Sequence, residues 1–275
     1  MQEEAERLLQ KIQKAKTGNL STEISSETYA QKQARWYNEE AGGLSGYNCP
    51  ICNNKGTIAY VPENGLFYTR DCECMKIRES MRRIEKSGLQ DLMKIYTFDN
   101  FITSFPWQMG AKQMALDFLK DYTGKWFFAG GQPGCGKTHL CTAITSEFMN
   151  MGKSAHYMLW RDEIVPLKAN VTDHAAYSNA IRRLKEIDVL YIDDFLKTDK
   201  GASPTSADVS IAFEILNYRY NNSNLITIIS SEKMFEDIIK IDEAVGSRIY
   251  HRAQQYSIIV DYDQQKNYRL HGETS

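Results

Sequence analysis

Apolar residues in the second half of the chain fall into short runs separated by longer amphipathic stretches. Four runs are compact enough for buried strands, and a fifth alternates like a half-buried strand: 126–129, 154–158, 189–192, 225–229 and 256–262. Two stretches between them repeat at helical spacing: Leu140, Ala143, Ile144, Phe148 and Met151, then Ile211, Ala212, Ile215, Leu216 and Tyr218. Strands that alternate with helices predict an α/β fold built on a parallel sheet.

Residues 1–45 follow a different, helical pattern. Apolar side chains line one face, opposite Lys, Glu and Gln: Ala5, Leu8, Leu9, Ile12 and Ala15. Gly18 marks a helix stop and Gly42 the next break. The stripe must be buried against the rest of this chain or against another protein, because periodicity reports a buried face without naming its partner.

The segment after the first predicted strand carries the most informative motif. Its residues match G-x-x-x-x-G-K-[ST], the P-loop pattern: Gly131, Gln132, Pro133, Gly134, Cys135, Gly136, Lys137 and Thr138. Glycines let backbone N–H groups turn inward around phosphate oxygens, and the helix N-terminus that follows favours an anion. We expect Lys137 to reach the β- and γ-phosphates of ATP and the Thr138 hydroxyl to bind Mg²⁺. A glycine-rich turn that happens to end in Lys-Thr is the alternative; the flanking strand and helix favour the P-loop.

The third predicted strand ends in two carboxylates, Asp193 and Asp194. In an open parallel sheet the carboxyl end of a strand opens into the ligand crevice, so the pair fits a Walker B motif. We expect Asp193 to hold Mg²⁺, directly or through water, and Asp194 to orient or deprotonate the attacking water. Paired acids can instead cap the following turn, but their position after a P-loop and one intervening strand favours the catalytic interpretation.

Two further features would complete a site of this kind. The fourth predicted strand ends in Ser230, Ser231 and Glu232, and a polar residue there can touch the γ-phosphate or the attacking water. Further along, Arg248 follows a Gly-Ser pair, and Arg252 lies one helical turn later. An arginine that reaches into a neighbouring subunit's site stabilises transition-state charge, which is the arginine-finger role. A surface ion pair is the alternative, and the sequence context favours Arg248 as the finger.

Two close cysteine pairs precede the predicted α/β domain: Cys49 with Cys52, and Cys72 with Cys74. Nineteen residues separate the pairs, and the Asn-Gly step at 64–65 is a strong hairpin signal that would fold the pairs face to face. Four thiolates from two turns suit a tetrahedral zinc ion, and such a closed site is structural because it leaves no position for water or substrate. Four unmetallated thiols are the alternative, since C-x-C is less common than C-x-x-C.

The stretch between the second cysteine pair and the first strand carries weaker signals. A basic helical run ends at Gly88: Lys76, Arg78, Arg82, Arg83 and Lys86. Such a run is usually a solvated face, with a DNA contact as the alternative. We expect a linker between Leu89 and Tyr96. Beyond it, Phe98 or Phe101 is placed to wall an adenine pocket, and simple core packing accounts for them at least as well.

Composition limits the remaining possibilities. The chain has 275 residues, 42% of them hydrophobic, which allows one large domain or a domain with an appended module. The formal charge of −2 gives no global field for nucleic acid or a membrane surface, so any DNA contact must come from a local patch. The acidic first residues and the lack of a long apolar run predict a cytoplasmic protein. Its cysteines are then reduced, and Cys135 and Cys141 are expected to be small packing residues.

Several segments together resemble the DnaC/DnaI group of replicative helicase loaders, with the IstB transposition ATPases as close relatives: 96–101, 131–140 (which adds His139 to the nucleotide-binding loop), 190–195 and 245–249. The resemblance covers about residues 95 to 270, and the tail from Asn267 to Leu270 is similar to the family's ending. It implies an AAA+ ATPase core with a parallel sheet and no C-terminal helical lid, which binds ATP between protomers.

The helical pattern, the cysteine pairs and the resemblance together divide the chain into three expected parts: a helical segment over 1–45, a zinc module with the basic helix over 46–92, and the AAA+ domain over 95–275. A cysteine module before the ATPase is similar to the DnaI-like and phage-encoded members. The implied activity is slow, stimulated ATP hydrolysis. The implied partners are a DnaB-type hexameric helicase, engaged by the N-terminal module, single-stranded DNA, and further copies of the chain.

The resemblance also assigns roles position by position: phosphate and Mg²⁺ to Lys137 and Thr138, Walker B to Asp193 and Asp194, sensor 1 to Ser230 or Ser231, and the finger to Arg248. Two departures stand out. Glu232 stands where many relatives end sensor 1 in Asn. The second Walker B acid is Asp194, where most AAA+ enzymes carry the longer Glu, and its shorter arm suggests hydrolysis slow enough to act as a timer.

Four functional classes follow from these patterns. A loader predicts weak ATPase activity that single-stranded DNA or helicase stimulates. An IstB-like helper predicts the same ATPase with a transposase partner, which the cysteine module argues against. A small-molecule P-loop kinase would need a lid with phosphate-binding arginines and an acceptor pocket, for which the sequence carries no signal. A zinc adaptor that binds nucleotide without turnover is the non-enzymatic alternative.

Overall fold

The computed structural model describes residues 27–86, 89–199 and 202–270, and the chain divides into two compact units. The first unit extends to Leu44 and resumes over 48–72; the second holds 45–47 and the chain from Glu73 onward. The predicted apolar stripe of the N-terminal helix and the helix stop at Gly88 lie outside the described residues: Ala5, Leu8, Leu9, Ile12, Ala15 and Gly88.

The N-terminal unit combines one helix with one hairpin. Helix α2 (Tyr29–Glu39) starts at a capping box, in which the Gln31 N–H donates to Thr28 Oγ1 and the Thr28 N–H donates to Gln31 Oε1. Strands β1 (Thr57–Tyr60) and β2 (Tyr68–Asp71) pair antiparallel, which confirms the hairpin predicted from the Asn-Gly step at 64–65.

Five parallel strands form the sheet of the second unit, and each lies within two residues of its predicted position: β3 (Phe127–Gly131), β4 (Ala155–Leu159), β5 (Val189–Asp193), β6 (Ile226–Ser230) and β7 (Ser257–Val260). Their spatial order is β4-β5-β6-β3-β7. Strand β6 therefore lies between β5 and β3, so strands that are distant in the chain end side by side.

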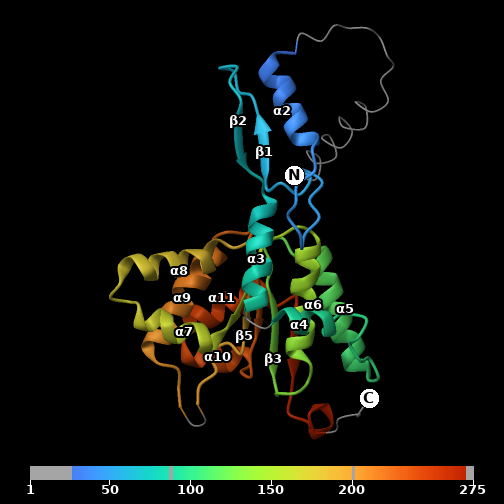
Figure 1. Ribbon diagram of the computed structural model, residues 1–275. Coiled ribbons are helices and arrows are strands. Elements are labelled where there is room, and N and C mark those ends of the chain that lie inside the picture. Colours follow the sequence, from blue (N-terminus) through green and yellow to red (C-terminus); the bar gives the residue numbers. More distant parts are fainter. Residues whose placement is uncertain (1–26, 87–88, 200–201, 271–275) are drawn as a thin grey trace. The chain divides into compact units, whose positions relative to one another are not determined.

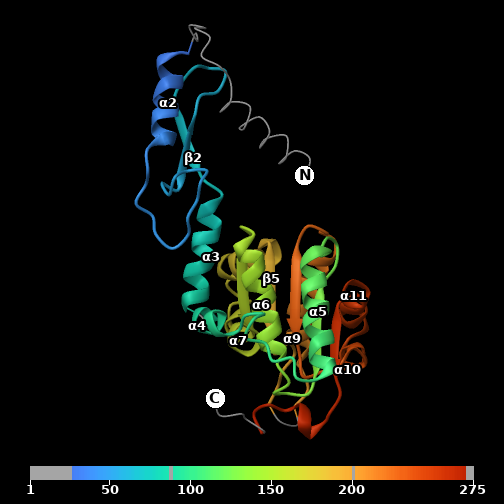
Figure 2. The same cartoon turned by 90° about the vertical axis from the view of Figure 1, so that its right-hand side faces the viewer.

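Helices cover both faces of this sheet (Figures 1 and 2). One face carries α4 (Leu89–Ile95), α5 (Pro106–Lys120) and α6 (Lys137–Asn150); the other carries α7 (Trp160–Ala169), α8 (His174–Glu186), α9 (Ser206–Tyr220), α10 (Phe235–Ile241) and α11 (Glu243–Ala253). Side-chain alternation along each strand feeds the two cores: in β5, Tyr191 packs on the α6 side and Ile192 on the α9 side.

The prediction of a linker between Leu89 and Tyr96 is wrong. The segment Leu89–Ile95 is helix α4, and Leu89 is fully buried in the core that α6 also joins. Leu92 and Met93 pack against the same core, so the spacing i, i+3, i+4 carried the helical signal. Packing against this core makes the segment Leu89–Ile95 part of the second unit and not a linker.

Helix α3 (Cys74–Lys86) contains the basic run, and one of its cations is structural. Arg78 is only 5% exposed, and its guanidinium donates to the Ser45 and Tyr47 carbonyl oxygens at 2.5 and 2.6 Å. The expectation of a solvated basic face is therefore wrong for Arg78. Lys76 fits that expectation, because it is exposed and pairs with Glu73 at 2.8 Å.

A buried arginine fixes the amino ends of two central strands. The side chain of Arg219, on α9, is fully buried, and its guanidinium donates to the Ile187 and Ile226 carbonyl oxygens at 2.9 and 2.6 Å. Further bonds reach the carbonyl of Leu184 at 3.1 Å and the Thr227 hydroxyl at 2.9 Å. Burial lowers the pKa of Arg219 to about 9, and the guanidinium therefore stays charged at neutral pH. Each of its three nitrogens donates a hydrogen bond, as a buried charge requires.

Beyond α11 the described chain forms β7 and the short 3₁₀ turn Gln264–Lys266. In the part of the chain that the structure describes, every helix is too short or too polar to cross a bilayer.

Candidate nucleotide site and cysteine cluster

Three neighbouring strand ends meet at one edge of the sheet. The P-loop follows β3, Asp193 is the last residue of β5, and Ser230 is the last residue of β6, which lies between them. Because all strands are parallel, their carboxyl ends share this edge, where ligands bind in open α/β sheets. The sheet topology thus brings the candidate residues together from segments far apart in the chain.

The P-loop conformation requires its glycines. Gly131 has φ of 105°, and a Cβ on it would lie 2.1 Å from the Val260 carbonyl oxygen. Gly136, with φ of 91°, is the residue before α6, and a Cβ there would lie 3.0 Å from the Phe101 ring. The helix starts at Lys137, so the N–H groups of its first turn have no partner within the helix and can bind an anion.

Lys137 is buried within its own loop. The ammonium donates to the carbonyl oxygens of Gly131 at 2.8 Å and Gln132 at 2.7 Å, and the residue is 9% exposed. The loop therefore closes around its own lysine. Phosphate oxygens would have to replace those two carbonyls as acceptors.

Asp193 is the most strongly connected acid of the edge. It is 5% exposed, and its Oδ1 accepts from the Ser230 hydroxyl and from Thr138 Oγ1 at 3.4 Å. Its Oδ2 accepts from the Tyr157 hydroxyl at 3.0 Å. Tyr157 lies on β4, and burial together with the Asp193 charge raises its pKa, so the hydroxyl keeps its proton. Sequence reasoning missed this tyrosine, because its position in a predicted strand is the only signal that marks it.

A magnesium ion fits the oxygen pair at this edge. The Thr138 hydroxyl and the Asp193 carboxylate lie 3.4 Å apart, and hard cations prefer such ligands together with water and phosphate oxygens. One cation could therefore bind both groups without a change in the backbone. The chemistry of the donors thus agrees with the Mg²⁺ ligands predicted from the motifs.

Asp194 is held differently from its neighbour. It adopts a left-handed backbone conformation with φ of 54°, and its Oδ2 pairs with the Lys197 ammonium at 2.9 Å. Lys197 also pairs with Glu232 at 3.0 Å. Burial lowers the pKa of Lys197, but its bonds to the two carboxylates outweigh that effect and raise it overall. Sequence reasoning missed Lys197, although it lies only three residues after Asp194.

The two candidate sensor residues face different groups. Ser230 donates to Asp193 and accepts the Asp194 N–H at 3.3 Å. Ser231 is fully buried, and its hydroxyl donates to the Phe195 carbonyl oxygen at 2.8 Å. The structure therefore brings Ser230 into the cluster of Walker-type residues, whereas Ser231 holds the turn after β5.

Other residues of the loop hold the C-terminal segment. The Gln132 side chain accepts from the Asp263 N–H at 2.6 Å and donates to the Asp263 carbonyl at 2.9 Å, and its own N–H donates to Val260. Gly134 accepts the Tyr268 N–H at 3.0 Å. The N–H of Gln132 is thus used by the fold and does not face a phosphate.

The remaining predicted loop residues divide between surface and core. Pro133 is exposed, while Cys135 is 3% exposed with its thiol toward the Gln132 carbonyl. Cys141 is fully buried, and burial raises the pKa of both thiols, which agrees with packing roles.

His139 packs on the segment that leads into the domain. Its ring stacks on Tyr96 with centroids 4.7 Å apart, meets Phe101 edge-on at 5.2 Å, and bonds the Thr97 carbonyl at 2.8 Å. Burial lowers its pKa, which favours the neutral ring. Phe101 is buried and Phe98 partly buried in the same core, so packing accounts for both phenylalanines.

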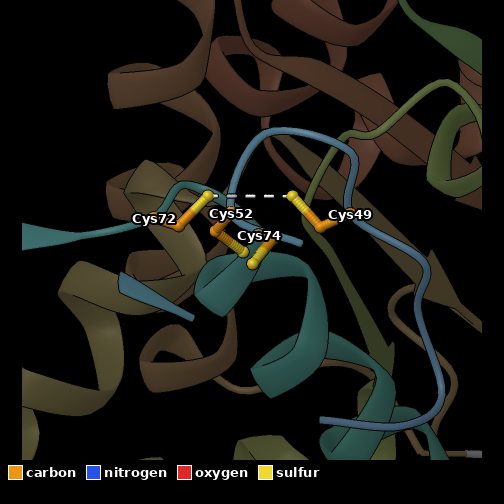
Figure 3. A group of neighbouring side chains, drawn as sticks. All are labelled: Cys49, Cys52, Cys72 and Cys74. Carbon is orange, nitrogen blue, oxygen red and sulfur yellow. Dashed lines mark hydrogen bonds between the residues drawn. The ribbon is translucent and has the colours of Figure 1, made fainter. Parts of the chain in front are cut away.

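The four cysteines of the N-terminal pairs converge (Figure 3). The sulfur atoms of Cys49, Cys52, Cys72 and Cys74 all lie within 4.8 Å of one another, and all four residues are buried. The Cys49 and Cys72 sulfurs are 3.8 Å apart, which is about the edge of a tetrahedron with Zn–S bonds of about 2.3 Å. A disulfide would require about 2 Å. The donor set and its spacing fit a structural zinc ion.

Local turns explain how the close spacings are reached. Cys72 follows β2 and donates its N–H to the Gly56 carbonyl at 2.8 Å, whereas Cys74 is the first residue of α3. The Gly56 N–H in turn donates to the Cys52 sulfur at 3.3 Å. The C-x-C spacing therefore works because Cys72 directly follows the end of a strand and Cys74 begins a helix.

Residues 70–274 match the family of IstB-like ATP binding proteins. The chain belongs to this family. One relative is the phage-like element PBSX protein XkdC of Bacillus subtilis, 32% identical over 240 residues that cover 83% of this chain and 88% of XkdC. The replicative helicase loader DnaC of Escherichia coli K12 is 24% identical over 202 residues, 71% of this chain and 78% of DnaC.

Solved structures share the fold of this IstB-like chain. The crystal structure of DnaI aligns with a TM-score of 0.51 at 19% identity and covers 62% of this chain and 93% of DnaI. The replication initiator DnaA, bound to AMPPCP and single-stranded DNA, aligns with a TM-score of 0.51 at 20% identity over 63% of this chain. That match spans about half, 52%, of the DnaA chain. The predicted family and AAA+ fold class are confirmed, and the chain is an ATP-binding AAA+ ATPase.

The predicted arginine finger of this IstB-like ATPase, Arg248, lies on α11 and not at the edge that carries the P-loop and Asp193. Arg248 is half-buried; it donates to Asn217 Oδ1 at 3.1 Å and the Ala244 carbonyl at 2.7 Å, and lies 4.9 Å from the Phe213 ring centroid. In the described part of the chain, Arg248 makes none of these hydrogen bonds or ring contacts with the P-loop or with Asp193. Arg252 instead donates to the Gly124 carbonyl at 2.5 Å and ties down the turn before β3.

Proposed function

We propose that this protein loads a DnaB-type hexameric replicative helicase onto single-stranded DNA in the cytoplasm and uses ATP to time the transfer. The observation that carries the proposal is the pairing of an AAA+ nucleotide edge with a preceding four-cysteine module, in a chain similar to the loader DnaC over 78% of DnaC's length. In this proposal residues 46–92 bind the helicase and residues 95–275 bind and hydrolyse ATP.

The proposed reaction is hydrolysis of the terminal phosphate. The oxygen of a water molecule forms a bond to the γ-phosphorus while the bond to the bridging oxygen breaks, and that oxygen keeps the electron pair as ADP leaves. Asp194 orients the water and accepts its proton, which then passes to solvent. Lys137 and the N–H groups of the P-loop hold the β- and γ-phosphates, and Ser230 fixes Asp193.

Two metal ions would serve the proposed function in different ways. A bound Mg²⁺, held by Thr138 and Asp193, would neutralise charge on the β- and γ-phosphate oxygens. A zinc ion held by the four cysteines would stabilise the N-terminal module and take no part in the reaction.

The second half of the site is proposed to come from a neighbouring copy. Arg248 is the candidate, because it is half-buried on a helix and its partners among the described residues are a side-chain amide, one carbonyl and two aromatic rings, those of Phe213 and Tyr220. These contacts can be exchanged for a phosphate without unfolding α11. We expect Arg248→Ala to lose ATP turnover about 1,000-fold while it still binds nucleotide. The matched control is Arg182→Ala, an exposed arginine on α8 bonded to Asn179.

The decisive experiment combines the purified full chain with the hexameric replicative helicase of its host and circular single-stranded DNA. We expect an ATP-dependent complex, transfer of the helicase onto the circle, and ATP turnover that DNA or helicase stimulates. Lys137→Ala should abolish transfer. Absence of any complex with the helicase, in the presence of normal ATP turnover, would contradict the loader proposal.

The family description favours one alternative, a helper ATPase for a transposase, since the match is to IstB-like proteins. That function predicts ATP turnover that a transposase stimulates and a helicase leaves unchanged. Turnover absent under every condition would instead point to a nucleotide-binding zinc adaptor.

A further inference from the structure

Lys197 lies between two carboxylates at the nucleotide edge. Its ammonium is 2.9 Å from Asp194 Oδ2 and 3.0 Å from Glu232 Oε1. The three side chains are similarly accessible, at 34%, 32% and 39% for Lys197, Asp194 and Glu232. The lysine therefore joins the acid after β5 to the residue after β6, and each carboxylate restricts where the ammonium can move.

The backbone holds this turn firmly in place. The Lys197 N–H donates to the Asp194 carbonyl at 3.0 Å, and the Phe195 N–H donates to the Ser230 carbonyl at 2.8 Å. Leu196 is buried with φ of 56°, a left-handed conformation that non-glycine residues rarely adopt and that tends to persist at functional sites. The position of Lys197 relative to Asp194 is thus set by the fold and not by a free surface loop.

The two Walker-type acids differ in how their carboxylates are fixed. Asp193 has three side-chain hydroxyl partners: Thr138, Tyr157 and Ser230. Among the described residues, the carboxylate of Asp194 has Lys197 as its hydrogen-bonded side-chain partner. An aspartate that must orient water needs one oxygen fixed and the other available, and the ion pair through Oδ2 leaves Oδ1 for water.

We propose that Lys197 is a positioning residue for ATP hydrolysis: it fixes the Asp194 carboxylate through their ion pair, and Glu232 fixes Lys197 from the opposite side. The inference rests on the proposed role of Asp194 as the acid that orients the attacking water. It also assigns a function to Glu232, which stands where many relatives carry the sensor 1 Asn. The Glu232 carboxylate pairs with Lys197, so we assign the sensor role to Ser230.

A solvating role and a restraining role for Lys197 predict results that differ from those of positioning. Exposed lysine–carboxylate pairs often do no more than solvate a surface, in which case removal of Lys197 leaves turnover unchanged. An ion pair that restrains Asp194 would hold hydrolysis back, in which case removal of Lys197 accelerates turnover. Positioning predicts a loss.

The test measures steady-state ATP hydrolysis by the full chain with Mg²⁺, single-stranded DNA and helicase present. For Lys197→Met we expect kcat to fall about tenfold with the KM for ATP within about twofold, because binding of the phosphates does not involve Lys197. Lys197→Arg should recover most of kcat, since it keeps the charge. Glu232→Gln should fall about threefold, because Lys197 keeps one of its two partners.

A matched control and a double variant separate positioning from loss of structure. Lys94→Met removes a lysine with the same three-residue spacing from its aspartate, Asp91, at 3.0 Å on α4, and should leave kcat unchanged. Lys197→Met combined with Glu232→Gln should be no slower than Lys197→Met alone, because Glu232 acts through Lys197. Additive losses, an unchanged or raised kcat, or failure of Lys197→Arg to recover activity would each overturn the inference.

Failure of the wider proposal has a separate signature. If wild type and Lys137→Ala hydrolyse ATP equally, the nucleotide site itself is misassigned. If wild type depends on Lys137 but not on Lys197, only the positioning role fails. Lys197→Met can be compared with wild type only if the two melt at the same temperature. If Lys197→Met melts lower, the turnover of Lys197→Arg and Glu232→Gln, which keep the side-chain volume, decides whether Lys197 positions Asp194.

Discussion

The nucleotide edge and the cysteine cluster are built by different means. The edge takes Asp193 and Ser230 from the ends of two strands and Lys137 from the helix start after a third, and parallel ladders and two buried cores hold these strands together. The cluster takes its thiols from residues 49–74, where each strand has four residues and every residue of β2 is exposed. One site is fixed by the scaffold before a ligand arrives; the other has little scaffold of its own.

This difference predicts opposite responses to loss of the ligand. A site held by a sheet should keep its shape when nucleotide leaves, because parallel ladders and buried cores fix the strand ends that carry it. A small module with few buried apolar residues depends on metal bonds, and zinc binding then contributes directly to folding free energy. Changes at the two sites, from the largest expected effect to the smallest, break or sharpen this contrast.

Removal of zinc should have the largest effect. We expect one zinc ion per chain, and a strong chelator should unfold residues 48–72 while ATP binding continues, because structural zinc sites contribute about 10 kcal/mol or more to folding. Metal analysis and hydrogen exchange measure the two parts independently. Cys52→Ser should behave like chelation. Cys141→Ala, which removes a buried thiol outside the cluster, should retain zinc. A zinc-free protein with full protection over 48–72 would remove the contrast altogether.

The scaffold of the edge is tested by Arg219→Met. This variant leaves the carbonyl oxygens of Ile187 and Ile226 without their charged donor inside the core, so we expect a loss of about 3 kcal/mol or more in the free energy of unfolding. Denaturant unfolding measures it. Arg219→Lys should not rescue, because one ammonium cannot reach all the acceptors.

The matched control for the scaffold is Arg182→Met, on the exposed surface of α8. It should change stability by less than about 0.5 kcal/mol. Equal effects of the two substitutions would mean that the buried guanidinium is dispensable and that the sheet edge is less firmly held than its hydrogen bonds indicate.

Local motifs made much of this edge predictable. The P-loop pattern and the paired acids after an apolar run are contiguous, so spacing alone predicted a strand end beside a helix start. The predicted sheet followed from the same periodicity. Helix α4 was missed because a short helix after a glycine reads as a boundary, although the apolar spacing of Leu89, Leu92 and Met93 was present.

Contacts between distant segments were beyond the reach of the sequence. Gln132 bonds Asp263 across 131 positions, and Tyr157 reaches Asp193 across 36. Which residues meet depends on strand order and register, and neither is written in a local pattern. Lys197 is a different case: its spacing from Asp194 was visible, but the left-handed turn that aims the two side chains together was not.

Lys137→Ala tests whether the edge stays folded when its central cation is removed. We expect kcat/KM for ATP to fall at least about 100-fold, because a buried, preorganised positive charge on the phosphates is lost. The melting temperature should change little, since the hydrogen bonds of the Lys137 ammonium in the described part of the chain go to carbonyl oxygens of its own loop. Nucleotide binding, turnover and thermal melting are measured together. Lys120→Ala, at an exposed lysine on α5, provides the comparison, and a collapse of the melting temperature in Lys137→Ala alone would show that the edge is not independent of its lysine.

The smallest expected effect concerns the least predictable contact. Tyr157→Phe removes the hydroxyl that donates to Asp193 at 3.0 Å but keeps the ring, which packs on Tyr191 with centroids 5.2 Å apart. Loss of one hydrogen bond to a buried carboxylate corresponds to about 1.5 kcal/mol, or roughly a tenfold decrease in activity. The loss should be largest at limiting Mg²⁺, because Asp193 then depends on the Thr138 and Ser230 hydroxyls and the Asp194 N–H to orient it. A Mg²⁺ titration of ATP turnover, with Tyr218→Phe as the exposed control, measures this dependence. A decrease that is the same at all Mg²⁺ concentrations would place the effect of Tyr157 in the packing of β4 and not in the orientation of Asp193.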